Sequence, residues 1–243
     1  MIDVAFTPAS MRPCAVAVVI DVLRATSSIV QALAAGYERV SCCPSPERAE
    51  GLRREGTVLA GERGCLPIPG FDLGNSPSGL RHPLGAELVL CTTNGTPALV
   101  AAAGVAERVV VAALSNLDAV VAALDGADVQ VVCAGTDGRP GLDDVYVAGR
   151  IVALLGGRRT DGAAMAECLA AHYTTAEAAL RASQAARNLC AVGLLADVAD
   201  CSRESIFDVV PVVGGVGDGV ANVTAARRVT HSFGTMRHAR HLA

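Results

Sequence analysis

The sequence predicts an α/β protein, a three-layer α/β/α fold on a largely parallel or mixed sheet. Val-rich apolar runs alternate with Ala- and Leu-rich segments of helical period along most of the 243 residues. Runs such as V-A-V-V-I (16–20) and V-Q-V-V-C (129–133) are almost entirely apolar, as expected for strands covered on both faces. Apolar residues make up 51% of the chain and aromatic residues 3%, so aliphatic side chains must form the core.

The apolar runs place eight strands, which are expected at 2–6, 15–21, 38–43, 57–60, 87–91, 108–113, 129–133 and 207–213. The segments between them place the helices, which are expected at 26–35, 46–55, 96–103, 116–124, 142–155, 161–171, 174–181 and 183–191. Gly36 and Gly193 follow two of these helices, where a glycine commonly ends the last turn. Pro97 suits the first turn of the helix at 96.

Three segments depart from the strand–helix alternation. Residues 61–86 form a long connection rich in Gly, Pro, Asn and Ser, and long connections in compact domains are usually functional or disordered. Residues 160–200 are mostly helical and are expected to form a cap or a lateral layer. We expect one α/β domain over residues 1–213, followed by a mobile or docking tail at 214–243 that begins G-G-V-G-D-G.

Composition excludes several classes of protein. The net charge is −4 and stacking aromatic residues are few, which argues against a nucleic-acid partner. No apolar run reaches the length of a membrane span, and no secretory signal is visible at the start. Nine Cys without a C-x-x-C pair predict a reduced, cytoplasmic protein. The apolar content of 51% leaves room for a buried subunit interface in a homo-oligomer, but the sequence does not define the oligomeric state.

The basic residues are all Arg, because the chain contains no Lys. A Schiff-base lysine, a pyridoxal-phosphate lysine and a Walker lysine are therefore excluded. Any anion held by a cationic side chain must be held by Arg, whose planar fork donates two parallel hydrogen bonds to phosphate or sulfonate.

Four polar clusters follow strands, where the ligands of open α/β sheets bind. They are D-V-L-R-A-T-S-S (21–28), G-E-R-G (61–64) running into G-F-D-L-G-N-S-P (70–77), T-T-N-G-T (92–96), and A-G-T-D-G-R-P-G-L-D-D (134–144). Each alone could be a helix cap or a turn. Four clusters of the same chemistry at one edge predict a functional site.

The clusters combine two kinds of group. Their carboxylates select hard cations such as Mg²⁺ and are Asp21, Glu62, Asp72, Asp137, Asp143 and Asp144. Their guanidiniums select anions, as do helix-start N–H groups, and are Arg24, Arg63 and Arg139. A cation beside an anion clamp is the equipment of phosphoryl transfer.

These motifs, with the late G-L-L-A-D-V (193–198) and V-V-P-V (209–212), together resemble the 2-phosphosulfolactate phosphatase family. The resemblance runs in order over residues 1–213. It implies a three-layer α/β fold and a Mg²⁺-dependent phosphatase tied to coenzyme M synthesis. Where the family commonly reads L-E-D, this chain reads Leu142-Asp143-Asp144, which moves one carboxylate inward by a methylene and puts its metal distance in question.

The resemblance implies hydrolysis of a small phosphorylated acid, 2-phospho-3-sulfolactate, to 3-sulfolactate and phosphate. Within that reaction we assign the catalytic role to Asp21, Arg24, Glu62 and Asp144. We assign Mg²⁺ binding to Asp21, Asp72, Asp143 and Asp144. We assign substrate and phosphate binding to Arg24, Thr26, Arg63, Asn75, Ser76, Thr92, Thr93, Asn94, Gly95 and Thr96.

Alternatives remain open at this stage. Asp21 could attack phosphorus itself, as in haloacid-dehalogenase-type phosphatases, although their second Asp is Leu23 here and their Lys is absent. Cys133 and Arg139 fit the C-x5-R loop of cysteine phosphatases. The chain could also act on a different small phosphorylated acid, or bind a phosphometabolite with little catalysis.

Overall fold

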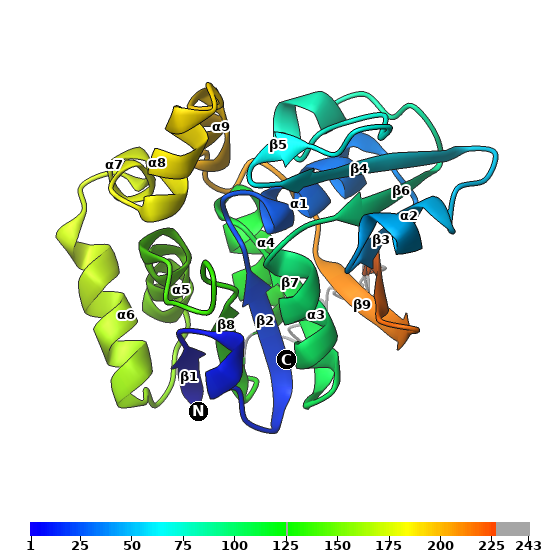
Figure 1. The fold of residues 1–243 in the computed structure, drawn as a ribbon. Helices are drawn as coiled ribbons and strands as arrows, with labels where there is room; N and C mark the ends of the chain where they lie inside the picture. Colours follow the sequence, from blue (N-terminus) through cyan, green and yellow to red (C-terminus); the bar gives the residue numbers. More distant parts are fainter. Residues whose placement is uncertain (125, 227–243) are drawn as a thin grey trace, which may run out of the picture.

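A computed structural model of the chain describes residues 1–124 and 126–226 and has the α/β architecture that the sequence predicts (Figure 1). Ten strands form one sheet within these residues. They are β1 (Ile2–Ala5), β2 (Cys14–Ile20), β3 (Arg39–Cys43), β4 (Thr57–Arg63), β5 (Leu66–Pro67), β6 (Glu87–Cys91), β7 (Ala106–Ala112), β8 (Val129–Cys133), β9 (Pro211–Gly217) and β10 (Val220–Ala225).

The helices follow the expected positions closely, with two exceptions. They are α1 (Ala25–Ala35), α2 (Pro46–Glu50), α3 (Gly95–Ala103), α4 (Leu117–Leu124), α5 (Leu142–Leu154), α6 (Asp161–His172), α7 (Ala176–Arg181), α8 (Gln184–Ala191) and α9 (Ala196–Cys201). The helix expected at 46–55 stops at Glu50, and α9 was not expected. In the described chain, no helix combines the length and apolar character needed to cross a membrane.

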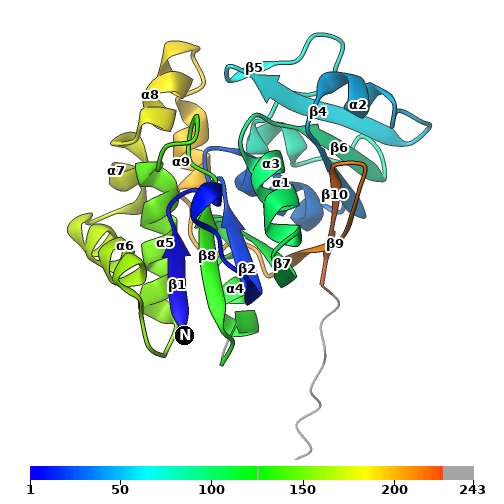
Figure 2. The same cartoon turned by 60° about the horizontal axis from the view of Figure 1, so that its bottom comes forward.

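The sheet consists of two parallel blocks joined by an antiparallel hairpin. Its strand order is β1-β8-β2-β7-β9-β10-β3-β6-β4-β5. Strands β1, β8, β2 and β7 are parallel to one another, as are β3, β6 and β4. The β9–β10 hairpin lies between the blocks and pairs antiparallel with both (Figure 2). The mixed sheet that the sequence predicts is therefore present.

The two blocks lie crosswise, with β2 running across the direction of β4 and β6 (Figure 1). Because of this bend, the carboxyl end of β2 comes close to the carboxyl ends of β4 and β6. Residues that follow all three strands line one pocket. The sequence predicts a shared edge for these ends, and the structure brings them together through the bend.

Helices cover both faces of the first block, as alternation along β2 shows. Val18 and Ile20 belong to the core that α4 and α5 close, whereas Ala17 and Val19 belong to the core that α1 and α3 close. Side chains of a strand point alternately to its two faces, so a continuous apolar run is required here. The helical block expected at 160–200 is present as α6 to α9, and α6 packs against α5.

The expected tail differs from the structure in its first part. The last strand was expected at 207–213, but β9 runs over Pro211–Gly217, so the expected domain boundary falls inside it. Residues 214–225 belong to the sheet. Asp218 and Gly219 have φ values of +49° and +74° and form the two-residue turn of the hairpin, which is the turn that Asp-Gly favours. Residues 227–243 lie outside the described residues.

Candidate functional site

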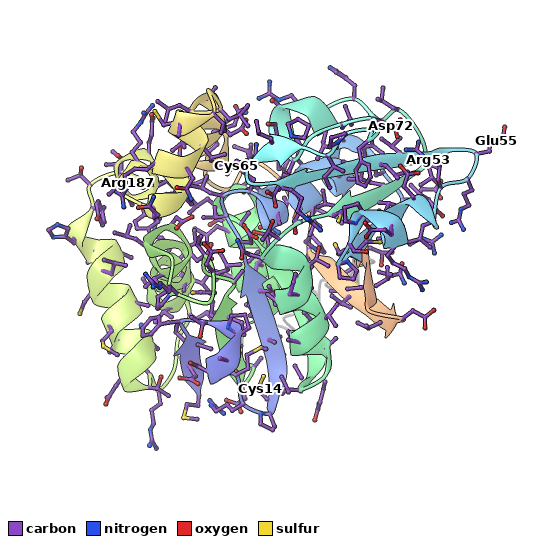
Figure 3. The ribbon with its side chains drawn as sticks, viewed as in Figure 1. Cys14, Arg53, Glu55, Cys65, Asp72 and Arg187 are labelled. Carbon is purple, nitrogen blue, oxygen red and sulfur yellow. The ribbon has the colours of Figure 1, made fainter. Side chains whose placement is uncertain are left out.

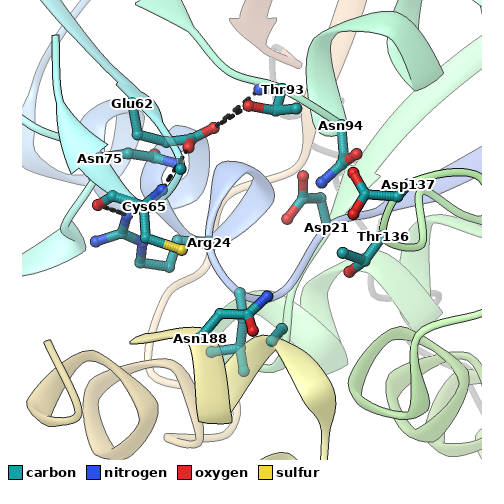
Figure 4. A pocket seen from close by; sticks show the side chains of 13 residues that line it. Asp21, Arg24, Glu62, Cys65, Asn75, Thr93, Asn94, Thr136, Asp137 and Asn188 are labelled. Carbon is teal, nitrogen blue, oxygen red and sulfur yellow. Dashed lines mark hydrogen bonds between the residues drawn. The ribbon is translucent and has the colours of Figure 1, made fainter. Parts of the chain in front are cut away.

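A pocket of about 240 Å³ opens where the two blocks of the sheet meet (Figure 4). All four expected polar clusters contribute to its wall, and α8 contributes as well. The lining residues are Asp21, Leu23, Arg24, Glu62, Gly64, Cys65, Asn75, Thr93, Asn94, Thr136, Asp137, Ala185 and Asn188. The clusters therefore converge as the sequence predicts.

Asp21 sits at the end of β2, where its carboxylate faces the start of two helices. Its Oδ1 accepts a hydrogen bond from the N–H of Ala25 at 3.3 Å, and the N–H of Gly95 also donates to this carboxylate. Burial, together with the negative charges of Asp143 and Glu62, raises the pKa of Asp21 to about 7. A carboxyl that titrates near neutrality is typical of catalytic and cation-binding sites.

Gly95 is the first residue of α3 and its lack of a side chain allows α3 to approach Asp21. A Cβ at this position would lie 2.5 Å from the Cβ of Ala25 and 2.8 Å from Oδ2 of Asp21. Only glycine therefore lets the start of α3 pack against β2 without displacing the carboxylate. This close approach explains why the T-T-N-G-T motif needs a glycine at position 95.

Asp144 connects the ends of β2 and β8. Its Oδ1 accepts from the N–H of Val22 and its Oδ2 from the N–H of Gly135, both at 2.9 Å. Burial raises the pKa of Asp144 well above its usual range, and the charges of Asp143 and Asp21 add to the effect. The carboxylate thus holds two loops of the pocket and does not line the pocket itself.

Asp143 is buried at the start of α5, and it lines a second cavity next to the first. Burial raises the pKa of its carboxyl to about 6, although N–H groups of Asp143 and Asp144 donate to it. Its negative charge acts on Asp21. Asp21 and Asp143 are therefore two buried carboxylates with raised pKa values, and the charge of Asp143 disfavours ionisation of Asp21.

Glu62 joins the loops that follow β4 and β6. Its Oε1 accepts from the N–H and the hydroxyl of Thr93, each at 2.9 Å, and its Oε2 accepts from the N–H of Cys65 at 3.0 Å. Figure 4 shows these bonds along one wall of the pocket. Because both oxygens have partners, the geometry favours a positioning role for Glu62 over that of a free base.

Arg24 lines the pocket, but its positive charge is paired with the carboxylate of Asp197. The guanidinium is buried and donates to Asp197 at 2.7 Å, to the hydroxyl of Ser76 at 3.2 Å and to the carbonyl of Cys65 at 2.9 Å. Asp197 belongs to α9, which was not expected. The anion clamp and the catalytic role expected of Arg24 do not follow from this geometry, because a buried ion pair already uses its charge.

Two expected site residues point elsewhere. Arg63 donates to the carbonyls of Glu62 and Pro44 and to Sγ of Cys91, because neighbours on a strand face opposite sides and Glu62 faces the pocket. Asp72 accepts from the N–H of Leu59 at 2.8 Å and lies beside Arg53, away from Cys65 (Figure 3). Neither residue lines the pocket, so the anion role of Arg63 and the metal role of Asp72 receive no support from its geometry.

Most of the expected hydroxyl groups stabilise the turns around the pocket. Thr26 accepts from the N–H of Asp21 at 3.1 Å, and Thr92 accepts from the N–H of Thr96 at 3.2 Å. Ser76 donates to Asp197 at 2.7 Å. These residues shape the site and are absent from the pocket wall, so the substrate contacts expected of them differ from what the geometry provides.

Amide groups face the pocket in their place. Asn75, Asn94 and Asn188 all line it. Asn75 is 3% exposed, and its Oδ1 has no hydrogen-bond partner among the described residues. A buried polar atom without a partner is costly, so Oδ1 of Asn75 is available to accept a hydrogen bond from a bound molecule or a water.

Asn188 was not identified as a site residue from the sequence, although it lines the pocket. It comes from α8, so only the expectation that residues 160–200 form a cap pointed to it. Thr136 and Asp137 belonged to an expected cluster, although we assigned them no role.

Cys133 is fully buried at the end of β8, and burial raises the pKa of its thiol well above the usual range. A cysteine nucleophile needs an exposed thiolate of lowered pKa, so the C-x5-R interpretation is wrong. We expect Cys133→Ala to keep turnover within about threefold of the wild type, since it removes only a small buried group. Steady-state assay of the folded variant checks this, and complete inactivation would contradict it.

The donors around Asp21 suit a cation that takes few protein ligands. No three His, Cys, Asp or Glu side chains within residues 1–124 and 126–226 converge as a ready metal cage. Mg²⁺ commonly binds through one or two carboxylates, with waters and substrate phosphate oxygens filling the remaining positions. Asp21 and Asp143, both buried and repelling each other, fit that kind of site.

Comparisons with known proteins agree with the motifs. The model of the family described as 2-phosphosulpholactate phosphatase matches residues 4–215. A probable 2-phosphosulfolactate phosphatase of Thermotoga petrophila is 41% identical over 224 residues, covering 89% of this chain and 97% of that protein. One from Thermus thermophilus is 42% identical over 212 residues, covering 82% and 88%. The 2-phosphosulfolactate phosphatase of Methanothermobacter thermautotrophicus is 36% identical over 197 residues, covering 80% and 85%.

Proposed function

Because the chain belongs to the 2-phosphosulpholactate phosphatase family, we propose that it hydrolyses 2-phospho-3-sulfolactate to 3-sulfolactate and inorganic phosphate. The observation that carries this proposal is the pocket at the junction of the two blocks. There a buried carboxyl with a pKa of about 7, Asp21, lies among amide and hydroxyl groups. Such a pocket suits a small polar ester, and its volume of about 240 Å³ suits a three-carbon acid.

We also propose that the enzyme uses Mg²⁺, held by Asp21 and Asp143. Both carboxylates are buried, and their charges act on each other. When bound, the cation supplies positive charge that stabilises the phosphate oxygens as the ester bond breaks. The shorter side chain of Asp143 keeps its carboxylate close to the first turn of α5, whose N–H groups orient it.

The remaining residues bind and orient the ester. Asn94 and Thr93 stand at the start of α3, and N–H groups at a helix start favour anions. Asn75 and Asn188 offer amide groups from opposite walls. Asp144 and Glu62 hold the loops that carry these groups.

We also propose that the enzyme is cytoplasmic and that it serves coenzyme M synthesis. All nine Cys are free thiols, which supports a reducing compartment.

The substrate is tested by phosphate release from a panel of esters at equal concentration. We expect kcat/KM for 2-phospho-3-sulfolactate to exceed that for glycerol 2-phosphate by about 100-fold or more, because the pocket must match the acid as well as the phosphate. Equal rates on both esters would contradict the substrate assignment. Tight binding without release would instead favour a phosphometabolite-binding protein.

A further inference from the structure

A second cavity, of about 630 Å³, adjoins the catalytic pocket. The two share Thr136, Asp137 and Ala185 in their walls, so a small molecule can extend from one to the other. The second cavity lies between the turn after β8, the start of α5 and the start of α8. Two guanidiniums line it, from Arg139 and Arg187.

The turn at Thr136–Arg139 presents a carboxylate to both cavities and a guanidinium to the second cavity alone. Asp137 and Gly138 have φ values of +51° and +73°, and Thr136 and Arg139 exchange both backbone hydrogen bonds, at 2.9 and 3.0 Å. This is a tight two-residue turn of the kind that Asp-Gly favours. It places Asp137 in the wall of the catalytic pocket, beside Asn94 and Asp21 (Figure 4), while Arg139 lines only the second cavity.

Neither guanidinium is neutralised by an ion pair among the described residues. Arg187 donates to the amide oxygen of Gln184 at 3.0 Å and to the carbonyl of Ala182 at 2.9 Å, both uncharged groups. Arg139 makes no side-chain hydrogen bond or ion pair with the described part of the chain. Other arginines of the molecule, such as Arg24 and Arg159, are paired with carboxylates.

Two carboxylates, those of Asp137 and Asp143, line the same cavity, but neither forms an ion pair with Arg139 or Arg187. Asp143 accepts from N–H groups of the first turn of α5, and Asp137 also belongs to the catalytic pocket. The start of α8, with Ser183 as its cap, adds the positive end of a helix to the same cavity. Beside its two carboxylates, the second cavity therefore offers two guanidiniums that form no ion pair with the described residues and can bind an anion.

We propose that Arg139 and Arg187 form the subsite for the sulfonate of the substrate, while its phosphate lies in the catalytic pocket. This inference rests on the proposed function. Planar guanidiniums donate paired hydrogen bonds to the oxygens of a sulfonate. The subsite would explain how an enzyme without Lys selects a phosphate ester that carries a further strong acid.

The test compares two substrates that differ only in that acid. 2-Phospholactate has a hydrogen where 2-phospho-3-sulfolactate has the sulfonate. For Arg139→Gln and Arg187→Gln we expect KM for the sulfonated ester to rise about 10-fold each, as for loss of a charge-assisted hydrogen bond. KM for 2-phospholactate and kcat for both should stay within about twofold.

Matched controls separate the subsite from general electrostatics. Arg181 of α7 pairs with Glu177 at 2.8 Å, outside both cavities, so Arg181→Gln should change neither KM. Arg139→Lys and Arg187→Lys keep the charge and should lose less than the Gln variants. Equal losses on both substrates, or no loss on the sulfonated one, would overturn the subsite.

Binding of product keeps the subsite testable if neither ester is hydrolysed, an outcome that would refute the proposed function alone. By calorimetry, 3-sulfolactate should bind the wild type at least about 10-fold more tightly than lactate. It should bind each Gln variant about 10-fold more weakly than the wild type. Indistinguishable binding of 3-sulfolactate and lactate would overturn the subsite.

Discussion

Replacing Asp21 by Asn is expected to lower kcat by about 1,000-fold while making the cation-free protein more stable at pH 8. The loss of turnover follows because the variant keeps the shape of the side chain and removes the charge that would hold the cation. The hydrogen bonds from Ala25 and Gly95 can still be accepted by the amide oxygen. Activity and stability should therefore change in opposite directions.

The sign of the stability change follows from the pKa. Asp21 has a pKa of about 7 in the folded protein and 3.8 as an ordinary value. Between these pH values the folded state binds more protons than the unfolded chain, so stability falls as pH rises through this window. Each unit of pKa difference corresponds to about 1.4 kcal/mol. The neutral Asn avoids this cost above pH 7.

Thermal unfolding in EDTA at pH 5 and pH 8 measures the effect. The wild type should lose more stability between the two pH values than Asp21→Asn does. Glu55 is exposed, so Glu55→Gln removes a carboxylate without relieving burial and serves as the matched control. A variant that unfolds at a lower temperature than the wild type at pH 8, or retains most turnover, would refute the assignment of Asp21.

Asp144→Ala should lower stability, whereas Asp21→Asn should raise it, although the charges of Asp144 and Asp21 act on each other. We expect the free energy of unfolding to fall by about 3 kcal/mol, because two buried N–H groups lose their acceptor. These groups belong to Val22 and Gly135, at the ends of β2 and β8. Turnover should fall by about 100-fold or more, since both loops carry pocket residues.

Urea unfolding and steady-state assay below the midpoint separate the two losses. Asp144→Asn keeps one acceptor and should lie between Asp144→Ala and the wild type in both measurements. If Asp144→Ala were as stable as the wild type, the bridging role would be wrong. The contrast with Asp21→Asn distinguishes a carboxylate that orders loops from one that is held ready for a cation.

Local features of this fold could be predicted from the sequence. The expected strand at 129–133 and the expected helix start at 142 have the same bounds in the structure. A nearly continuous apolar run defines the strand locally, and a pair of acidic residues defines the helix start. The hairpin at 211–225 could also have been predicted from the sequence. Asp218-Gly219 is a strong two-residue turn, but the surrounding glycines favoured a tail.

Long-range partners could not be predicted. Arg24 and Asp197 are 173 residues apart in the chain, and no local pattern reveals that one neutralises the other. The crosswise arrangement of the blocks likewise depends on the sheet as a whole. The orientation of Arg63 could have been found, since it follows Glu62 on the same strand and must face the other side.

The most direct measurement of the central claim is phosphate release from 2-phospho-3-sulfolactate before and after removal of divalent cations. We predict that EDTA-treated wild-type protein releases no phosphate, and that added Mg²⁺ restores release in the wild type but not in Asp21→Asn. Equal release with and without divalent cations, or full Mg²⁺-dependent release by Asp21→Asn, would contradict a cation site built on Asp21.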